Sequence, residues 1–228
     1  MCGRYDQHHG MEDYLAQMDW LWDLPLIDNS DAPLRYNVPP RTYRPVLHLD
    51  GQQPLIDDLH WGYQAPWAVG KVPVAINSRV DKLLGRYWKP LLKSGRAIVI
   101  ADAWYEWTEV NGVKQPWRIH RKDNLPILMA AVANFGPMVD DNKATAGFAI
   151  VTDAAEGGMV DVHDRRPAIF DPADAMQWLD HSLTPEEAED LARTQPLGPN
   201  SFQWYKVSKA VGSVKNDGED LILELNEL

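Results

Sequence analysis

The sequence is poor in cysteine, with one thiol, Cys2, in 228 residues. A single cysteine excludes an internal disulfide and is typical of a reducing compartment, so we expect a cytoplasmic protein. Long apolar runs are also missing. The longest, Ile127 to Ala133, is far shorter than the roughly 20 residues that a membrane helix needs. The first residues are polar and lack the apolar core of a secretion signal, so we expect neither export nor a membrane partner.

An excess of positive charge is missing too, because the formal net charge is −11. The negative charge is concentrated in two stretches. Asp171 to Ala192 contains seven acidic residues and no lysine or arginine, and the acidic C-terminal segment 217–228 contains five acidic residues and no base. The rest of the chain is therefore close to neutral, and a local basic face remains allowed.

Apolar patterning predicts a mixture of helices and short strands. Amphipathic spacing favours helices over Gly10 to Trp22, Asp81 to Leu92 and Pro172 to Leu179, and Thr184 followed by Pro185 opens another. Eight apolar runs read as strands, with the Asn111-Gly112 hairpin turn between two of them. These runs are Pro45 to Leu49, Leu55 to Trp61, Val72 to Ile76, Ala97 to Ala101, Trp104 to Thr108, Val113 to His120, Ile127 to Ala133 and Phe148 to Val151. We expect one α+β domain over residues 1–228, with a largely antiparallel, barrel-like sheet and flanking helices.

The position of the cysteine suggests chemistry at the N-terminus. Initiator methionine is normally removed before a small residue, which would leave Cys2 with a free α-amine beside its thiol. The pKa values of such groups, ~7.7–8.0 and ~8.5, give both a nucleophilic form near neutral pH. The pair is suited to attack on a carbonyl, or to condensation with an aldehyde through a Schiff base into a thiazolidine. The alternative is an unreactive thiol at a frayed terminus.

Other polar residues follow apolar segments in ways that suggest a site. Asn37 lies in a rigid Pro-rich segment, where the alternative is a structural turn. Arg79 is suited to a phosphate, or to a surface ion pair with Asp81. Glu106 lies among aromatic residues, where desolvation would raise its pKa; the alternative is an edge-strand residue that faces water. His163 stands beside two acids and two arginines and titrates where proton transfer is useful.

A metal centre is the weaker interpretation. The candidate ligands Cys2, His8, His9 and His163 match no zinc-binding spacing. We therefore expect no metal and no cofactor.

Seven segments together resemble the SOS response-associated peptidase (SRAP) family, in the family's order and over nearly the whole chain. They are MCGRY, RYNVPP, WGYQAPW, INSRVD, DAWYEW, VDVHDRRP and VSKAVGSVKNDG. The resemblance implies a mixed α/β domain with a barrel-like sheet. It also implies covalent capture of abasic sites in single-stranded DNA by the N-terminal cysteine, a role in the DNA damage response. The "peptidase" of the name would refer to removal of the residue ahead of that cysteine.

The resemblance also implies roles for individual residues. Cys2 would be the nucleophile, Asn77 would position the linkage, Glu106 would act as general acid and base around the amine and Schiff base, and His163 would move a proton on the sugar. The expected DNA contacts are Arg4, Asn37, Pro40, Trp67, Arg79 and Arg165. The segment QAPWAVGKVPV supplies only Trp67, where some family members have two adjacent tryptophans, which puts stacking on duplex DNA in doubt.

The resemblance and the composition also predict the oligomeric state, the binding partner and the location. We expect a monomer that binds single-stranded DNA containing abasic sites and associates with the nucleoid when bound. The Schiff base would also permit lyase-like chemistry. Two alternatives remain: an N-terminal cysteine amidohydrolase or protease, which would turn over an amide without DNA, and a non-covalent reader of modified or single-stranded DNA, whose binding would survive loss of the thiol.

Overall fold

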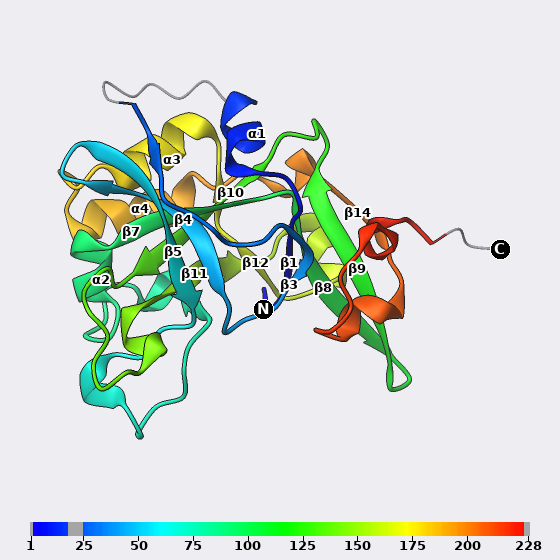
Figure 1. Ribbon diagram of the computed structural model, residues 1–228. Coiled ribbons are helices and arrows are strands. Elements are labelled where there is room, and N and C mark those ends of the chain that lie inside the picture. The colour runs from blue at the N-terminus through cyan, green and yellow to red at the C-terminus, as the bar shows by residue number, and fades with distance from the viewer. Residues whose placement is uncertain (1, 18–24, 226–228) are drawn as a thin grey trace.

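The computed structural model describes residues 2–17 and 25–225 and consists mainly of short strands (Figure 1). The strands are β1 (Tyr5–Gln7), β2 (Ile27–Asp28), β3 (Arg35–Val38), β4 (Tyr43–Asp50), β5 (Gln53–Trp61), β6 (Asn77–Arg79), β7 (Arg96–Ala101), β8 (Ala103–Val110), β9 (Val113–Arg121), β10 (Ile127–Ala133), β11 (Gly147–Ala154), β12 (Arg165–Pro167), β13 (Ile169–Phe170) and β14 (Phe202–Lys206). The α-helices are α1 (Met11–Ala16), α2 (Lys89–Ser94), α3 (Pro172–Leu179) and α4 (Pro185–Thr194).

The strands form two sheets. A five-stranded sheet has the order β14-β9-β8-β1-β3, and each of its pairings is antiparallel. The larger sheet has the order β12-β11-β10-β7-β4-β5-β2 with β6 and β13 attached, and a parallel pairing of β11 with β5 closes part of it into a ring. Closure brings two backbones unusually close. A Cβ atom on Gly147 would lie 2.3 Å from the Gly62 carbonyl oxygen, so this crossing requires glycine. The predicted α+β class with a barrel-like, largely antiparallel sheet is confirmed.

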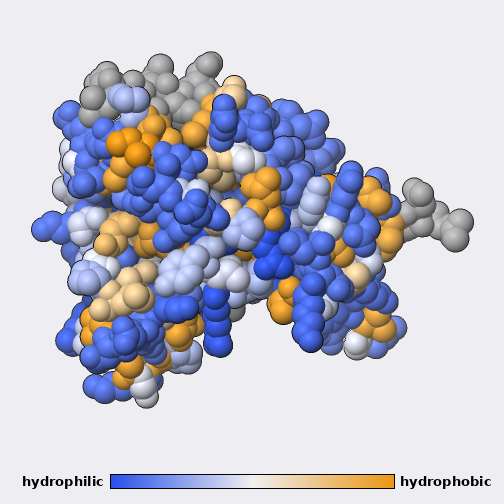
Figure 2. Space-filling view, viewed as in Figure 1, coloured by the Kyte–Doolittle hydropathy of each residue, from blue (hydrophilic) through white to orange (hydrophobic). Residues whose placement is uncertain are grey.

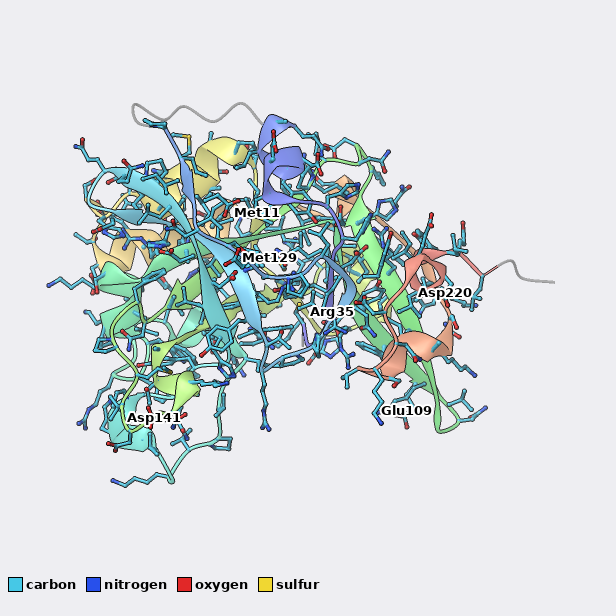
Figure 3. The ribbon with its side chains drawn as sticks, viewed as in Figure 1. Met11, Arg35, Glu109, Met129, Asp141 and Asp220 are labelled. Carbon is cyan, nitrogen blue, oxygen red and sulfur yellow. The ribbon has the colours of Figure 1, made fainter. Side chains whose placement is uncertain are left out.

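The core of the described residues has two large compartments separated by strands β7 and β10, which are buried along their whole length, and a small third cluster of Tyr105, Val207, Val211 and Leu221. Alternate side chains enter opposite compartments, as a strand dictates. Ile98 and Ile100 face the compartment that α2, α3 and α4 cover, whereas Val99 faces the compartment between the two sheets. Met129 belongs to this second compartment, in the middle of the molecule (Figure 3). Cys2 belongs to the same compartment, together with the aromatic side chains Tyr5, Trp61 and Trp104.

A buried arginine joins two of the covering helices to the sheet. The Arg96 guanidinium donates hydrogen bonds to the carbonyl oxygens of Leu92 (2.6 Å), Trp178 (2.6 Å) and Asp180 (2.5 Å). These carbonyls lie at the C-terminal ends of α2 and α3, where backbone oxygens have no intrahelical partner. One side chain from β7 therefore caps the C-terminal ends of both α2 and α3.

Most predicted elements are present, and two predictions are wrong. The helix over 172–179 and the Thr184 cap, whose hydroxyl accepts from the Glu187 backbone, are confirmed. The Asn111-Gly112 turn is also confirmed, with positive φ at both residues. Val72 to Ile76 is not a strand, because only an isolated bridge from Ala75 pairs there and the strand begins at residue 77.

The second error concerns the stretch 81–92, which contains a 3-10 turn over 80–82 and then only the start of α2. Pro90 near the beginning of α2 fits the first turn of a helix but not its interior, so a helix cannot continue from 81 through this residue. The helix predicted over 10–22 is confirmed for 11–16, and residues 18–24 lie outside the described residues.

Candidate functional site at the N-terminal strand

The N-terminal strand carries Cys2 into the gap between the two sheets. β1 pairs with β3 on one side and β8 on the other, and the Tyr105 N–H donates to the Arg4 carbonyl oxygen (3.0 Å). The Asn77 amide donates to the Cys2 carbonyl oxygen at 2.8 Å, which joins the first residues to β6 of the other sheet. Cys2 exposes none of its surface, and this burial raises the pKa of its thiol, with a further increase from the charge of Glu106.

Glu106 is a buried carboxyl group on β8, with 2% of its surface exposed. It points toward the sheet-to-sheet compartment, and burial raises the pKa of its carboxyl to about 7. The rise expected from its aromatic neighbours is therefore confirmed. A carboxyl group with this pKa exchanges protons readily near neutral pH, which is what a general acid or base requires.

His163 lies beside Glu106, with its Nε2 atom 3.9 Å from the Glu106 Oε2 atom. Burial lowers the pKa of the imidazole, so the ring is neutral at neutral pH. Two groups reach its Nδ1 atom: the Arg165 backbone N–H (3.0 Å) favours the tautomer with the proton on Nε2, toward Glu106, and Asp164 Oδ1 (2.7 Å) favours the one with the proton on Nδ1. Asp164 Oδ1, 2.7 Å from Nδ1, becomes an ion-pair partner when the ring is protonated.

A cavity of about 530 Å³ opens next to these groups. Its lining includes Gly3, Arg4, Glu106, Trp107, Glu109, Lys114, His163 and Gly212. The surface is indented between the parts built on the two sheets, where Figure 1 places the N-terminus (Figure 2). Two cations and an aromatic ring beside a buried acid and a histidine make a wall suited to a polyanion with a reactive group.

Arg4 is held in the cavity wall by Asn37. The Arg4 guanidinium donates to Asn37 Oδ1 at 3.1 Å, and the Asn37 amide donates to the carbonyls of Val211 (3.1 Å), Ser213 (3.0 Å) and Asn216 (2.9 Å). Asn37 is fully buried. Its amide therefore bonds within the protein, and its observed contacts are with Arg4 and residues 211–216.

The remaining predicted DNA contacts are spread more widely. Arg79, two residues after Asn77 on β6, forms an exposed ion pair with Asp81 at 2.8 Å, and Arg165 on β12 donates to the Thr152 carbonyl oxygen at 2.6 Å. Pro40 follows β3 and is half-buried. Trp67 is 51% exposed in the 3-10 turn 66–68, where it contacts Tyr87 and Arg86. The structure therefore gathers Cys2, Asn77, Glu106 and His163 closely, while Trp67 belongs to a separate aromatic group.

The family model of the SOS response associated peptidase (SRAP) matches residues 1–214 of this chain. The chain belongs to the SRAP family. Similar proteins support the assignment. The abasic site processing protein YedK of Escherichia coli is 41% identical over 97% of this chain and 99% of its own length. The abasic site processing protein HMCES of Gallus gallus is 28% identical, over 83% of this chain and 66% of its own length.

Solved structures agree on the fold of this SRAP-family chain. The crystal structure of a phage-related protein of Bordetella bronchiseptica has a TM-score of 0.74 and 35% identity, and covers 91% of this chain and 95% of that protein. A protein of Bacteroides thetaiotaomicron shares the fold, with a TM-score of 0.77 at 18% identity over 99% of this chain and 100% of its own. In the described residues, no helix is long and apolar enough to span a membrane.

Sequence reasoning missed five of the eight residues that line the cavity of this SRAP-family chain: Gly3, Trp107, Glu109, Lys114 and Gly212. Strand alternation predicts that Trp107 faces away from Glu106, yet it lines the same cavity from the neighbouring position. Lys114 belongs to the hairpin after Asn111-Gly112, and Gly212 comes from the C-terminal segment. The position of Lys114 was predictable, because the Asn111-Gly112 hairpin pairs it with Glu109. Gly212 lies in VSKAVGSVKNDG, one of the seven segments that resemble the SRAP family, but only the fold brings it to the N-terminal strand.

Proposed function

We propose that this protein senses abasic sites in single-stranded DNA and captures them covalently through Cys2 after removal of Met1. An abasic sugar is in equilibrium with an open-chain aldehyde. The Cys2 amine attacks the aldehyde carbon and the oxygen leaves as water, giving an imine; the thiol then adds to the same carbon and closes a thiazolidine. The product shields the lesion during the DNA damage response.

The observation that carries this proposal is the convergence of three proton-handling or positioning groups on Cys2. Asn77 holds the Cys2 carbonyl at 2.8 Å and fixes the direction of the residue. Glu106, with a pKa of about 7, takes the proton that the amine must lose and returns it to the departing oxygen. Neutral His163, 3.9 Å from Glu106, exchanges a proton with the sugar hydroxyl.

Removal of Met1 has a defined chemical effect. While Met1 is attached, the Cys2 nitrogen is part of a peptide bond and is not nucleophilic. Its release creates an amine beside Glu106, and a nearby ammonium group would stabilise the charged carboxylate. The buried thiol, with its raised pKa, is a poor first nucleophile. The amine therefore attacks first and the thiol second, once imine formation has brought the carbon beside it.

The DNA backbone would be held by arginines around the cavity. Arg4 lines the cavity, and Arg165 adjoins His163 in the chain. Arg79 follows Asn77 closely on β6 and can exchange its exposed ion pair with Asp81 for a phosphate. Pro40 and Trp67 would line the path of the DNA strand, and the exposed Trp67 indole would be available for base stacking. Asn37 serves by orienting Arg4 rather than by direct contact.

The test is the intact mass of the full chain after incubation with a single-stranded oligonucleotide that contains one abasic site. We expect the mass of the chain without Met1 plus the oligonucleotide minus one water. Cys2→Ala, or a non-removable residue placed before Cys2, should yield no such product. An oligonucleotide without the abasic site is the control.

Three results would overturn the proposal. The first is an adduct of equal yield with Cys2→Ala. The second is hydrolysis of a peptide substrate that requires Cys2, with no DNA adduct, which would favour an amidohydrolase. The third is DNA binding that survives unchanged without Cys2 and without any adduct, which would favour a non-covalent reader.

A further inference from the structure

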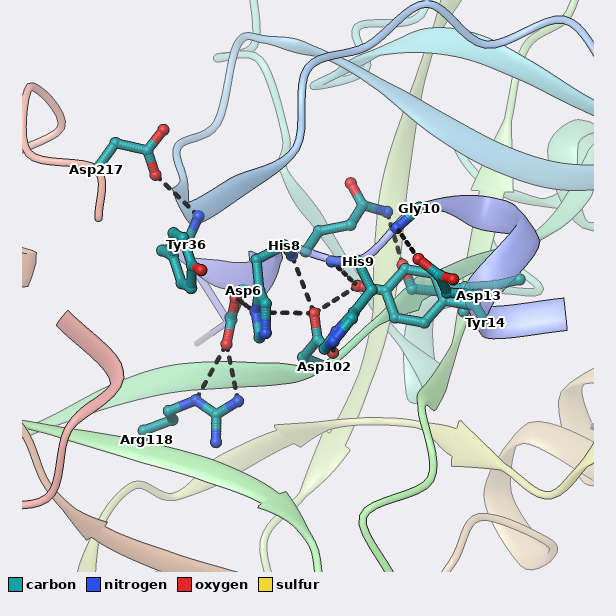
Figure 4. A network of polar contacts seen from close by, with 12 residues as sticks. Asp6, His8, His9, Gly10, Asp13, Tyr14, Tyr36, Asp102, Arg118 and Asp217 are labelled. Carbon is teal, nitrogen blue, oxygen red and sulfur yellow. Dashed lines mark hydrogen bonds and ion pairs between the residues drawn. The ribbon is translucent and has the colours of Figure 1, made fainter. Parts of the chain in front are cut away.

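A second polar cluster lies at the opposite end of β1 from Cys2 (Figure 4). His8 and His9 directly follow this strand, and Asp102 stands between β7 and β8. The His9 Nδ1 atom is 2.6 Å from Asp102 Oδ1, and the His8 Nδ1 atom is 3.1 Å from Asp102 Oδ2. One ligand-type atom from each of the three side chains lies within 4.8 Å of the other two. Two imidazoles and one carboxylate are a donor set typical of zinc and related transition metals.

The groups behind this cluster resemble the outer shell of a metal site. Asp102 Oδ2 accepts from the Tyr14 hydroxyl (2.5 Å) and from the His8 backbone N–H (2.9 Å), which fixes the carboxylate in place. Hydrogen bonds of this kind orient a ligating carboxylate. Asp6 Oδ1 lies 2.6 Å from the same His8 Nδ1 atom, and Asp6 is itself held by Arg118 at 2.8 Å; the His8–Asp6 hydrogen bond would be exchanged for the metal bond when the ion binds.

Spacing and access also fit an ion. Metal bonds of about 2.0–2.2 Å in a tetrahedron place ligand atoms about 3.3 Å apart. The present separations of 2.6 and 3.1 Å to Asp102 are hydrogen-bond lengths, so the two pairs need to open by about 0.7 and 0.2 Å. The His9 side chain is 48% exposed, which leaves a path from solvent.

We propose that His8, His9 and Asp102 form a binding site for a divalent transition-metal ion, with zinc as the best-fitting ion. On binding, the ion replaces protons that the imidazole nitrogens share with the carboxylates, and these protons are released to solvent. The ion would clamp the end of β1 to the start of β8, the two strands that carry Cys2 and Glu106. The chain separation of His9 and Asp102, 93 residues, explains why motif spacing gave no sign of the site.

The test is a calorimetric titration of Zn²⁺ into the full chain carrying Cys2→Ala, which removes the free thiol as a competing ligand. We expect one equivalent of Zn²⁺ to bind and to raise the midpoint of thermal unfolding. His9→Ala removes a ligand and should abolish both effects. Tyr14→Phe removes only an outer-shell hydrogen bond and should weaken binding by about 10- to 100-fold.

The matched control is His181→Ala, which removes an exposed histidine outside the cluster and should leave the Zn²⁺ affinity unchanged. Circular dichroism in the presence of a chelator verifies that each variant is folded. If His9→Ala does not fold, His9→Gln takes its place. The proposal is wrong if the parent binds no Zn²⁺, if the His9 variants bind as tightly as the parent, or if His181→Ala loses as much affinity as they do.

Discussion

Glu106→Gln should make the protein more stable while slowing its reaction. The carboxyl group is 2% exposed, and burial raises its pKa from the ordinary value of 4.5 to about 7. Between these two pH values the unfolded chain has released the proton and the folded chain still holds it. The folded state is therefore favoured most at low pH, and this contribution is lost as pH rises toward 7.

The size of the effect follows from the two pKa values. A difference from 4.5 to about 7 corresponds to about 3 kcal/mol of unfolding free energy, because one pKa unit equals 1.36 kcal/mol. Glutamine has a similar shape and does not ionise. The stability of Glu106→Gln relative to the parent should therefore increase by about 3 kcal/mol from acidic to mildly alkaline pH, with little further change above the folded-state pKa.

The assay is urea unfolding of both proteins across this pH range, with the difference in unfolding free energy plotted against pH. Taking the difference cancels the titration of all other groups. Glu109→Gln is the matched control, since it removes an exposed carboxyl group from the same strand and should give a flat difference (Figure 3). A flat difference for Glu106→Gln as well would refute the assignment of a desolvated carboxyl group.

The remaining predictions concern His163, Arg79 and Asp6. His163→Ala should still form the DNA adduct, but ~10²–10⁴-fold more slowly in a single-turnover time course, because it loses a proton carrier and not the nucleophile; a wild-type rate would leave His163 with a structural role. Arg79→Ala should leave the unfolding midpoint unchanged, because its ion pair with Asp81 is exposed. It should reduce the slope of log affinity for single-stranded DNA against log salt concentration by less than about one; an unaltered affinity would place the DNA elsewhere. Asp6→Ala should destabilise the fold by about 3–5 kcal/mol in urea unfolding, because it leaves the buried Arg118 guanidinium without its ion-pair partner; a loss under about 1 kcal/mol would contradict that account.

Local patterns were enough to predict much of the fold. Continuous apolar runs marked β7 and β10, and the Asn111-Gly112 dipeptide located the hairpin that presents Glu106. The raised pKa of Glu106 was predictable as well, because its aromatic neighbours in sequence are also neighbours on the strand. These features depend on interactions within a few residues or between paired strands.

Features that depend on distant segments escaped prediction. Val72 to Ile76 has the composition of a strand, yet only the following residues 77–79 find a parallel partner in β11. The role of Asn37 depends on the carbonyl of Val211, 174 residues away, and that of His9 on Asp102. The sequence around Asn37 or His9 would look the same whether or not these distant partners were present.

The contact between Asn37 and residues 211–216 has a consequence for the order of synthesis. Cys2 leaves the ribosome long before Val211, so the support behind Arg4 exists only once residues 211–216 have been synthesised. Until β8 has been translated, the amino end has no docking strand on that side and stays within reach of an aminopeptidase. Once β1 is in place, Cys2 exposes none of its surface. The removal of Met1 that the proposed function requires therefore belongs to the period of translation, before the two ends of the chain meet.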